Sequence, residues 1–448
     1  MISEIKRAKE HYTGKVYAKS FDCIGGKDVM PIGVWSGPDE GMETDRFYRE
    51  MQELGINLLI SPPTFLEHRS SLEKHLALAD RFGMAAFVPY SEKYFPESKE
   101  QMIEVHREMS RYTSFVGMTH RDELTYGEIW ADYVPVVRAF RETEYAGKYD
   151  YYFNANPIWS GLLSPRFFCG TSYATYLKSY VSRKGLGCSF LSADFYPFVG
   201  GDDLIVHNYF RQLAVQRDVA YKHGVPFWIY IQCGSIHDSR NLSETTASEA
   251  AFRWNVNTAL AYGAKGLSWF TLTYSNFGER NWYRIFHENG GDAALADRTA
   301  DGTQSALYDR YRGYRHNRWY DYAVRVSEHV RAVDEVLMNS YHAGVTSYGK
   351  SPYKVVKCGR IDGNEWFELN GISGDADLLI GCLEYGGKTA LYVVNNDYKI
   401  LDEEKTAVLS FDANYRFRVV QRAEERYETG EKISLRLQGG EGVLVVLQ

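Results

Sequence analysis

Short apolar runs alternate with longer amphipathic stretches over residues 29–339 of the chain. Eight of these runs have the length and the β-branched or aromatic content that are typical of buried strands. They are residues 30–35, 56–61, 84–90, 115–119, 149–155, 188–194, 225–232 and 265–272. Apolar runs of this kind, separated by helical patterns, indicate repeated βα units and a parallel sheet.

The helical patterns between the runs end in glycine. The stretches 45–55, 72–83, 208–224 and 246–263 finish on Gly55, Gly83, Gly224 and Gly263. A glycine just past a helix takes the left-handed conformation that ends it. Eight βα units in order, with no GxGxxG motif after the first run, favour a closed (β/α)8 TIM barrel over a doubly wound dinucleotide-binding sheet.

The pattern predicts three parts of the chain. Residues 1–28 are expected to form an N-terminal arm that packs on the barrel of residues 29–339. Within the barrel, residues 276–307 predict a long functional loop after the eighth strand, and residues 308–339 predict a long helix. From residue 340 the pattern becomes short alternating segments with turn dipeptides, which predicts an all-β, antiparallel sandwich-like domain over 340–448.

Charge and composition exclude several classes of partner. The net charge of −7 argues against nucleic acid. No apolar run reaches the roughly 18 residues of a membrane span, so no membrane partner is expected. The six cysteines lack metal-ligand spacing and are expected as free thiols in a reducing compartment. The charged, polar first residues lack the apolar core of a signal peptide, which favours a cytoplasmic location. A leader removed beforehand would leave the same sequence, so a secreted or periplasmic location stays open, and the oligomeric state is not indicated.

Carboxylates follow several predicted strands, and in such barrels the active site lies at the carboxyl ends of the strands. Glu92 follows the third strand, Asp122 and Glu123 follow the fourth, and Asp194 ends the sixth. Cleaving a glycosidic bond requires a proton donor and a second carboxylate that acts as base or nucleophile. We predict Glu123 as the general acid, Asp194 as the base or nucleophile, and Asp122 as a further catalytic candidate. The competing interpretations are that Asp122 or Glu123 caps the next helix and that Asp194 only anchors a loop.

Other polar and aromatic side chains at the strand ends are candidates for binding the hydroxyls and ring faces of a sugar. Aromatic residues make up 15% of the chain, and aromatic faces stack on sugar rings, although each such residue taken alone is more often part of the core than of a binding site. The candidates for substrate binding are Trp35, Glu92, His120, Asn154, Asn156, Tyr196, Tyr230, Gln232 and Trp269. No GxSxG motif, His-rich metal shell or strand-end lysine is present, so we expect no metal ion and no organic cofactor.

Four segments together resemble glycoside hydrolase barrels related to the family 42 β-galactosidases. They are FVGMTHRDE, SADFYPF, VPFWIYIQCG and TASEAAFRWNVNTALAYGAKGLSWFTL, and the resemblance spans roughly residues 29–339. It implies that Glu123 is the acid/base. The retaining enzymes of that clan place the nucleophilic Glu where this chain has Gln232, and an Asn where it has Asp122. Because an amide cannot form the glycosyl ester, either another carboxylate is the partner, or the geometry is inverting, or catalysis has been lost.

Three functions therefore compete. The leading prediction is hydrolysis of the O-glycosyl bonds of an oligosaccharide or glycoside from a plant, algal or host glycan. The alternative is a non-catalytic carbohydrate-binding protein on a degenerate glycosidase barrel, which the missing strand-seven Glu favours. A barrel lyase or isomerase would require a metal shell or a strand-end lysine.

Glu249 and Arg253, four residues apart on one predicted helix, are expected as a surface or inter-helix pair.

Overall fold

The structure of the protein is a computed structural model. It describes residues 19–35, 38–39, 41–60, 69–89, 99–119, 121–198, 203–233, 248–273, 287–292, 295, 307–309, 313–316, 318–350, 355–359, 368–399 and 403–448.

A parallel sheet closes into a barrel, which confirms the predicted fold. Each of the eight predicted runs contains a strand, and β1 pairs with both β2 and β9. The sheet has the order β5-β4-β3-β2-β1-β9-β8-β7-β6. Its strands are β1 (Ile32–Trp35), β2 (Leu58–Ile60), β3 (Ala85–Pro89), β4 (Phe115–Thr119), β5 (Asp150–Tyr152), β6 (Asn154–Ala155), β7 (Leu191–Ala193), β8 (Phe227–Gln232) and β9 (Leu267–Phe270).

The run 149–155 forms two strands instead of one. β5 pairs with β4, and β6 pairs with β7, so the chain passes from one end of the hydrogen-bonded ladder to the other at Phe153. The covalent chain therefore closes the barrel at this position.

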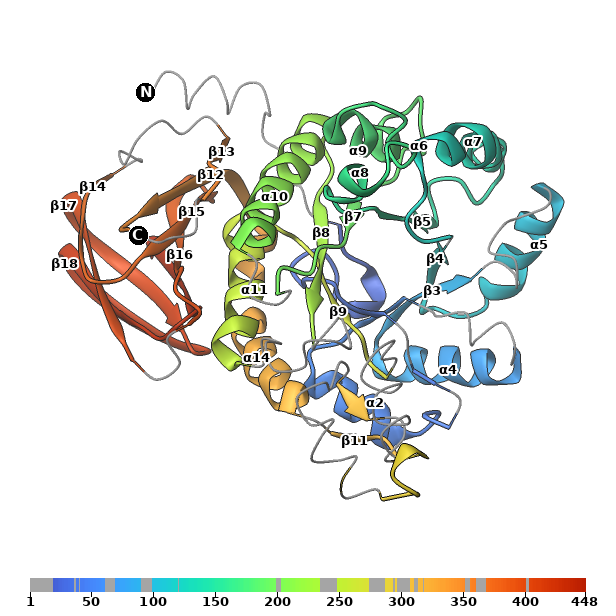
Figure 1. Ribbon diagram of the computed structural model, residues 1–448, viewed down its shortest axis with the longest axis horizontal. Helices are drawn as coiled ribbons and strands as arrows, with labels where there is room; N and C mark the ends of the chain where they lie inside the picture. Colours follow the sequence, from blue (N-terminus) through green and yellow to red (C-terminus); the bar gives the residue numbers. More distant parts are fainter. Residues whose placement is uncertain are drawn as a thin grey trace.

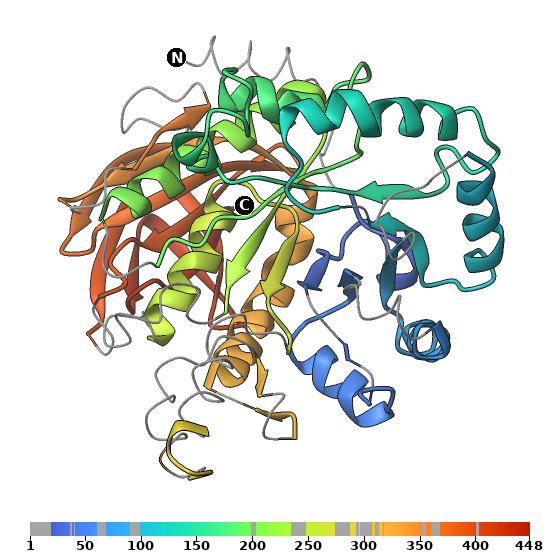
Figure 2. The ribbon, with the colours of Figure 1, turned by 45° about the vertical axis from the view of Figure 1, so that its right-hand side comes forward.

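Helices surround the strands, as Figure 2 shows. They are α2 (Asp45–Glu53), α4 (Arg69–Phe82), α5 (Lys99–Met109), α6 (Tyr126–Glu128), the π-helical η2 (Ile129–Tyr133), α7 (Val134–Phe140), α8 (Ser160–Leu163), α9 (Tyr173–Val181), α10 (Asp203–His223), α11 (Glu249–Ala261) and α14 (Arg318–Asn339). The four glycines predicted to end helices have φ values of 70°, 64°, 70° and 87° at Gly55, Gly83, Gly224 and Gly263. These left-handed values confirm the predicted helix ends. No helix within the described part of the chain is long and apolar enough to cross a membrane.

The long helix predicted over 308–339 begins later, at Arg318. Tyr308–Asp309 (β10) instead pairs antiparallel with Arg315–His316 (β11). The fully buried Tyr308 donates its hydroxyl to Glu50 on α2 at 3.0 Å, and its ring contacts Phe47 at 5.8 Å. These tertiary contacts outweigh the local helical preference. Of the predicted loop 276–307, the structure describes residues 287–292, 295 and 307, and the others lie outside the described residues.

Aromatic side chains fill the amino-terminal half of the barrel interior. Phe21 precedes the short 3-10 helix η1 (Asp22–Ile24), and Ile24 is its last residue. Both side chains join this inner cluster. The Phe21 ring contacts Phe87 at 5.8 Å and Trp228 at 6.3 Å. Residues 19–28 therefore close the amino-terminal end of the barrel, while residues 1–18 of the predicted arm lie outside the described residues.

An antiparallel sheet follows the barrel, with the order β13-β12-β15-β16-β19-β17-β14 and with β18 paired to β17. This confirms the predicted all-β fold of the C-terminal region. α14 ends at Asn339 and β12 begins at Ser340. The strands are β12 (Ser340–Tyr348), β13 (Cys358–Gly359), β14 (Leu369–Gly374), β15 (Leu378–Tyr385), β16 (Lys388–Asn395), β17 (Lys405–Gln421), β18 (Glu424–Leu437) and β19 (Gly442–Leu447).

This C-terminal sheet packs on the side of the barrel that α10, α11 and α14 cover (Figure 1). Along β16, Tyr392 and Val394 join the core shared with the barrel, whereas Leu391 and Val393 join a second core within the C-terminal region. Successive side chains of a strand point to opposite faces, so β16 is buried on both of them. The second core draws residues from β14 through β19, which gives the region its sandwich character.

Candidate active site at the carboxyl ends of the barrel strands

Three carboxyl groups converge where β4 and β7 end. The Glu123 carboxyl lies close enough to Asp194, and the Asp122 carboxyl close enough to Asn154, for each neighbour to shift the carboxyl pKa. Asn154 also donates its Nδ2 to Asp194 Oδ1 at 3.2 Å. The structure therefore brings together Asp122, Glu123 and Asp194, which we call the carboxyl cluster, around the Asn154 amide.

The surroundings of the carboxyl cluster favour retention of protons. Burial, together with the charge of Glu123, raises the pKa of Asp122. Burial also raises the pKa of Glu123, although the nearby Asp194 opposes the shift. The pKa of Asp194 is raised well above its usual range by burial and by the charges of both neighbours. Burial and the mutual repulsion of three close carboxyl groups therefore favour a proton on the cluster.

Glu123 differs from its two neighbours in its exposure to solvent and in its backbone. Water reaches the residue, although protein atoms surround its carboxyl group closely enough to raise its pKa. Its φ of 53° lies in the left-handed region, which is uncommon for a residue with a side chain. The Glu123 N–H donates to the Asn154 carbonyl at 3.1 Å, and this bond joins the β4 loop to β6.

Asn156 braces the loop that carries Glu123. Its Nδ2 donates to the Glu123 carbonyl at 2.7 Å and to the Leu124 carbonyl at 3.2 Å. Tyr176 on α9 donates its hydroxyl to the same Leu124 carbonyl at 2.7 Å. The Asn156 side chain is 1% exposed, so the structure places it behind the backbone of Glu123 and away from solvent.

The capping interpretation of Asp122 and Glu123 is wrong. Helix α6 begins with Thr125 as its N-cap, and the Thr125 side chain accepts from the Glu128 N–H. The Glu128 carboxylate accepts from the Thr125 N–H at 2.8 Å, which completes a capping box. The two acidic residues before Thr125 are therefore not required to start the helix.

Aromatic rings lie beside the carboxyl cluster. Trp35 at the end of β1 and Tyr196 after β7 are both half-buried. The Tyr196 ring contacts Phe270 at 4.7 Å, and the Trp35 ring meets Tyr230 edge-on at 6.0 Å. The pKa of Tyr196 is raised by burial first and then by the charges of the carboxyl cluster.

Tyr230 is nearly fully buried and belongs to a chain of polar groups that the sequence analysis missed. The Tyr152 hydroxyl lies 2.7 Å from the Tyr230 hydroxyl and 2.9 Å from Ser192 Oγ. Ser192 Oγ donates to Asn154 Oδ1 at 2.9 Å. Tyr152 and Ser192 each stand two residues before Asn154 and Asp194 in the chain, and alternation along the extended backbone places each pair on the inner face. That spacing is the signal that would have found them.

Two predicted binding residues have other partners. The Gln232 side chain accepts from the Phe198 N–H at 3.0 Å and donates to the Phe198 carbonyl at 3.1 Å. Trp269 is fully buried, donates to the Leu54 carbonyl at 3.0 Å, and packs on Phe252 of α11. The Gln232 side chain therefore holds the loop at Phe198, and Trp269 lies between the sheet and the helices. His120 and Glu92 lie outside the described residues.

No family model and no curated protein matches this sequence. Solved structures share its fold. A family 5 glycoside hydrolase from Bacteroides vulgatus superposes with a TM-score of 0.54 at 11% identity, over 94% of this chain and 89% of the other. A family 42 β-galactosidase from G. stearothermophilus gives a TM-score of 0.51 at 9% identity, over 96% of this chain and 100% of the other. At these identities the likeness establishes the shared barrel alone.

Proposed function

We propose that the protein is a glycoside hydrolase that cleaves O-glycosyl bonds, with Glu123 as the proton donor. The observation that carries the proposal is the carboxyl cluster at the carboxyl ends of the barrel strands. In a (β/α)8 barrel this end holds the active site. A carboxyl that keeps its proton near neutral pH is the group that must protonate the leaving oxygen of a glycoside.

Glu123 is the most exposed residue of the carboxyl cluster, so it is the one that a substrate can reach. Asp194 is 6% exposed, whereas Glu123 is exposed to solvent. Tyr196, whose half-buried ring lies beside the cluster, and the half-buried Trp35 are our candidates for the surface on which the sugar ring of an oligosaccharide or glycoside stacks. This chemistry requires no metal ion or organic cofactor.

Asp194 is our candidate for the base or nucleophile, and Asp122 is a further candidate, because both belong to the carboxyl cluster that contains Glu123. The two carboxyl groups of a retaining enzyme lie about 5–5.5 Å apart, and those of an inverting enzyme about 6.5–9.5 Å apart. Asp194 and Glu123 lie close enough for each to shift the pKa of the other. The anomeric configuration of the released sugar would show which of the two geometries applies.

The substitution Glu123→Gln tests the proposal. We expect turnover of glycosides with poor leaving groups, such as natural oligosaccharides, to fall by about 10²–10⁴-fold because general acid catalysis is lost. Dinitrophenyl glycosides need no protonation of the leaving group and should lose far less activity. Glu104→Gln is the matched control, because it removes the same group from an exposed position on α5. Rates of product release would be measured for all three proteins over the same substrate panel.

An equal loss on both kinds of substrate, or no loss, would show that Glu123 is not the acid. The second candidate function is carbohydrate binding without catalysis, and the observation that favours it is the amide of Gln232 at the end of β8. Wild-type protein that binds oligosaccharides in calorimetry but releases no product from any glycoside would establish that function instead.

A further inference from the structure

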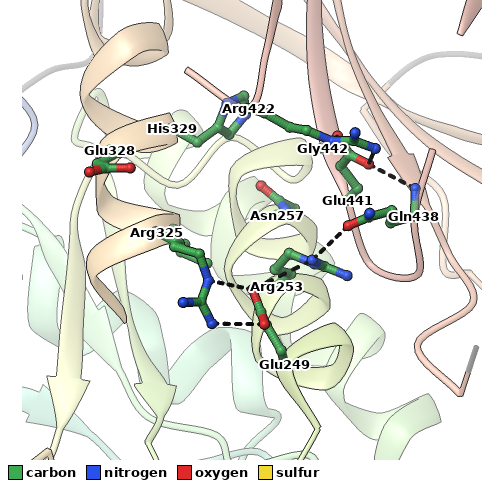
Figure 3. Close-up of a pocket in the computed structure, with 11 residues that line it drawn as sticks. Glu249, Arg253, Asn257, Arg325, Glu328, His329, Arg422, Gln438, Glu441 and Gly442 are labelled. Atoms are coloured by element: carbon green, nitrogen blue, oxygen red, sulfur yellow. Dashed lines mark hydrogen bonds and ion pairs between the residues drawn. The ribbon is translucent and has the colours of Figure 1, made fainter. Parts of the chain in front are cut away.

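The cavity between the barrel and the C-terminal sheet is lined by charged side chains that pair with one another (Figure 3). Glu249 of α11 accepts two hydrogen bonds of 2.8 Å from Arg325 of α14, which makes it part of an inter-helix pair, and lies 3.6 Å from Arg253. Glu441 accepts from Arg422 at 2.9 Å and 3.0 Å. These two carboxylates are therefore satisfied within the protein and require no ligand.

The surface of the barrel carries an exposed tryptophan. Among the described residues, the exposed large hydrophobic side chains are Trp130, at 37%, and Tyr427, at 48%. The Arg416 guanidinium covers the Tyr427 ring at 4.6 Å, and the Tyr427 hydroxyl donates to Glu425 at 2.5 Å. Trp130 instead meets the half-buried Tyr126 ring edge-on at 6.1 Å. We call Tyr126 and Trp130 the aromatic pair.

The aromatic pair lies at the active-site end of the barrel. Tyr126 begins α6 only three residues after Glu123. A helix that follows a barrel strand starts at the carboxyl end of that strand, which is the end that holds the active site. Side chains of a helix lean toward its amino terminus, so the Trp130 ring is directed back toward this end. The pair therefore stands on the side of the carboxyl cluster that carries Glu123.

Local hydrogen bonds hold the backbone of the aromatic pair in place. The capping box of Thr125 and Glu128 sets the start of α6. The Tyr126 N–H donates to the Phe167 carbonyl at 2.8 Å, which ties α6 to the loop that follows β6. Arg121 donates to Glu128 Oε1 at 2.8 Å. Charged groups that can bind hydroxyls therefore lie on the same helix turn as the rings.

Trp130 belongs to the π-helical segment η2, which is an unusual structure. The Val134 N–H donates to the Ile129 carbonyl, five residues back. Turns of this kind are rare and occur frequently at functional sites. Within η2, Ile129 and Tyr133 are buried, whereas Trp130 is exposed. The segment thus gives a reason to expect a ligand at Trp130 that is independent of its exposure.

We propose that the aromatic pair binds the sugar units on the leaving-group side of an oligosaccharide. The inference rests on the proposed hydrolase function. Glu123 protonates the leaving oxygen, so the leaving group lies on the side of the site where the pair stands. Aromatic faces stack on the apolar C–H faces of sugar rings. Trp130 follows Tyr126 by four residues, or about 6 Å along a helix, which is near the length of one sugar unit.

The size of the aromatic pair favours a sugar over a protein partner. A stable protein interface buries about 800 Å² on each partner, which is far more than two partly exposed rings can provide. A sugar ring, in contrast, is covered by one or two aromatic side chains.

Calorimetric titration with pentasaccharides tests the proposal without turnover. Cellopentaose, xylopentaose and β-1,4-galactopentaose would be titrated into full-length Glu123→Gln protein. We expect at least one of them to bind, and Trp130→Ala in the same protein to weaken that binding about fivefold or more because a stacking surface is lost. Trp130→Phe keeps a ring and should retain most of the affinity. Tyr427→Ala is the matched control, since it removes the other exposed ring, from β18, and should change nothing.

The proposal is overturned if Trp130→Ala binds as tightly as the parent protein, if Tyr427→Ala loses as much affinity, or if none of the three pentasaccharides binds. Failure of the hydrolase function gives a different result. The wild-type protein would then release no product, whereas binding that depends on Trp130 would still be measured. Thermal unfolding of each variant confirms that the titrated protein is folded.

Discussion

At the scale of single residues, the carboxyl cluster costs stability at neutral pH. The pKa values of Asp122, Glu123 and Asp194 are all raised in the folded protein, mainly by burial. The folded state therefore binds more protons than the unfolded state between the ordinary carboxyl pKa, about 4, and the raised values. Across that window the free energy of unfolding falls as pH rises.

Asp194→Asn should therefore stabilise the fold. The amide keeps the shape of the carboxyl and can accept from Asn154 as Asp194 does, but it adds no charge. We expect the free energy of unfolding to rise by about 1–2 kcal/mol at pH 7.5 and to change little at pH 4.5, while activity falls. Urea unfolding at the two pH values measures the difference. A loss of stability at both would mean that the charged hydrogen bonds of Asp194 outweigh its burial.

Most of the carboxyl cluster could be predicted from single residues. Asp122, Glu123, Asp194 and Asn154 all follow directly from the strand ends, because parallel strands bring their carboxyl ends to one edge. Gln232 stands at the same edge, yet its partner Phe198 lies in a loop whose path the sequence pattern does not indicate. Trp269 belongs to a strand whose apolar residues point alternately to the barrel interior and to the helices. Apolar content alone cannot show to which of the two sides Trp269 points.

At the scale of elements, one buried lysine holds the junction between α14 and β12. Lys265 is 1% exposed, and its Nζ donates to the carbonyls of Leu337, Met338 and Ser340 at 2.6, 3.1 and 2.7 Å. The last carbonyls of a helix have no partner within it. An ammonium group at this end satisfies them and opposes the negative end of the helix dipole.

Lys265→Met should lower the free energy of unfolding by about 2–4 kcal/mol, because three buried carbonyls lose their donor while the volume is kept. Lys222→Met, at an exposed position on α10, is the control. Chemical unfolding of both variants measures the difference. Equal stability of the two variants would show that water replaces the ammonium group at no cost.

The sequence predicts the positions of the helices and strands better than it predicts which of them contact one another. Each predicted run contains its strand because burial on both faces of a parallel sheet leaves a continuous apolar run. The division of 149–155 into β5 and β6 depends on β4 and β7, which are distant in sequence, and no local pattern reports it. The late start of α14 likewise depends on the contact of Tyr308 with Glu50 of α2.

At the scale of the whole molecule, the barrel and the C-terminal sheet share one core. Trp254 of α11 is fully buried, donates its Nε1 to Asn396 Oδ1 at 2.8 Å, and packs on Tyr398 at 5.0 Å. Arg217 of α10 donates to the His342 carbonyl of β12 at 2.6 Å. We keep residues 339 and 340 as the proposed domain boundary in the chain, but contacts this dense couple the stability of the two parts.

We therefore expect a single cooperative unfolding transition. Trp254→Ala should cost about 3–5 kcal/mol and shift the whole transition to lower temperature. Scanning calorimetry tests this by comparing the calorimetric and van't Hoff enthalpies, which agree when unfolding is two-state. A variant that unfolds in two steps, with one step unchanged from the wild type, would show that the barrel and the sheet are independent.

The burial of helix α11 on both sides predicts how its sequence changes during evolution. It lines the barrel on one side and carries the C-terminal sheet on the other, so every residue from Ala250 to Ala261 except Arg253 is buried. A helix with one solvent-exposed face tolerates substitutions at its exposed positions, whereas α11 has almost no exposed positions. Among descendants of a common ancestor, this segment should accumulate substitutions most slowly and remain alignable after the surrounding sequence has diverged.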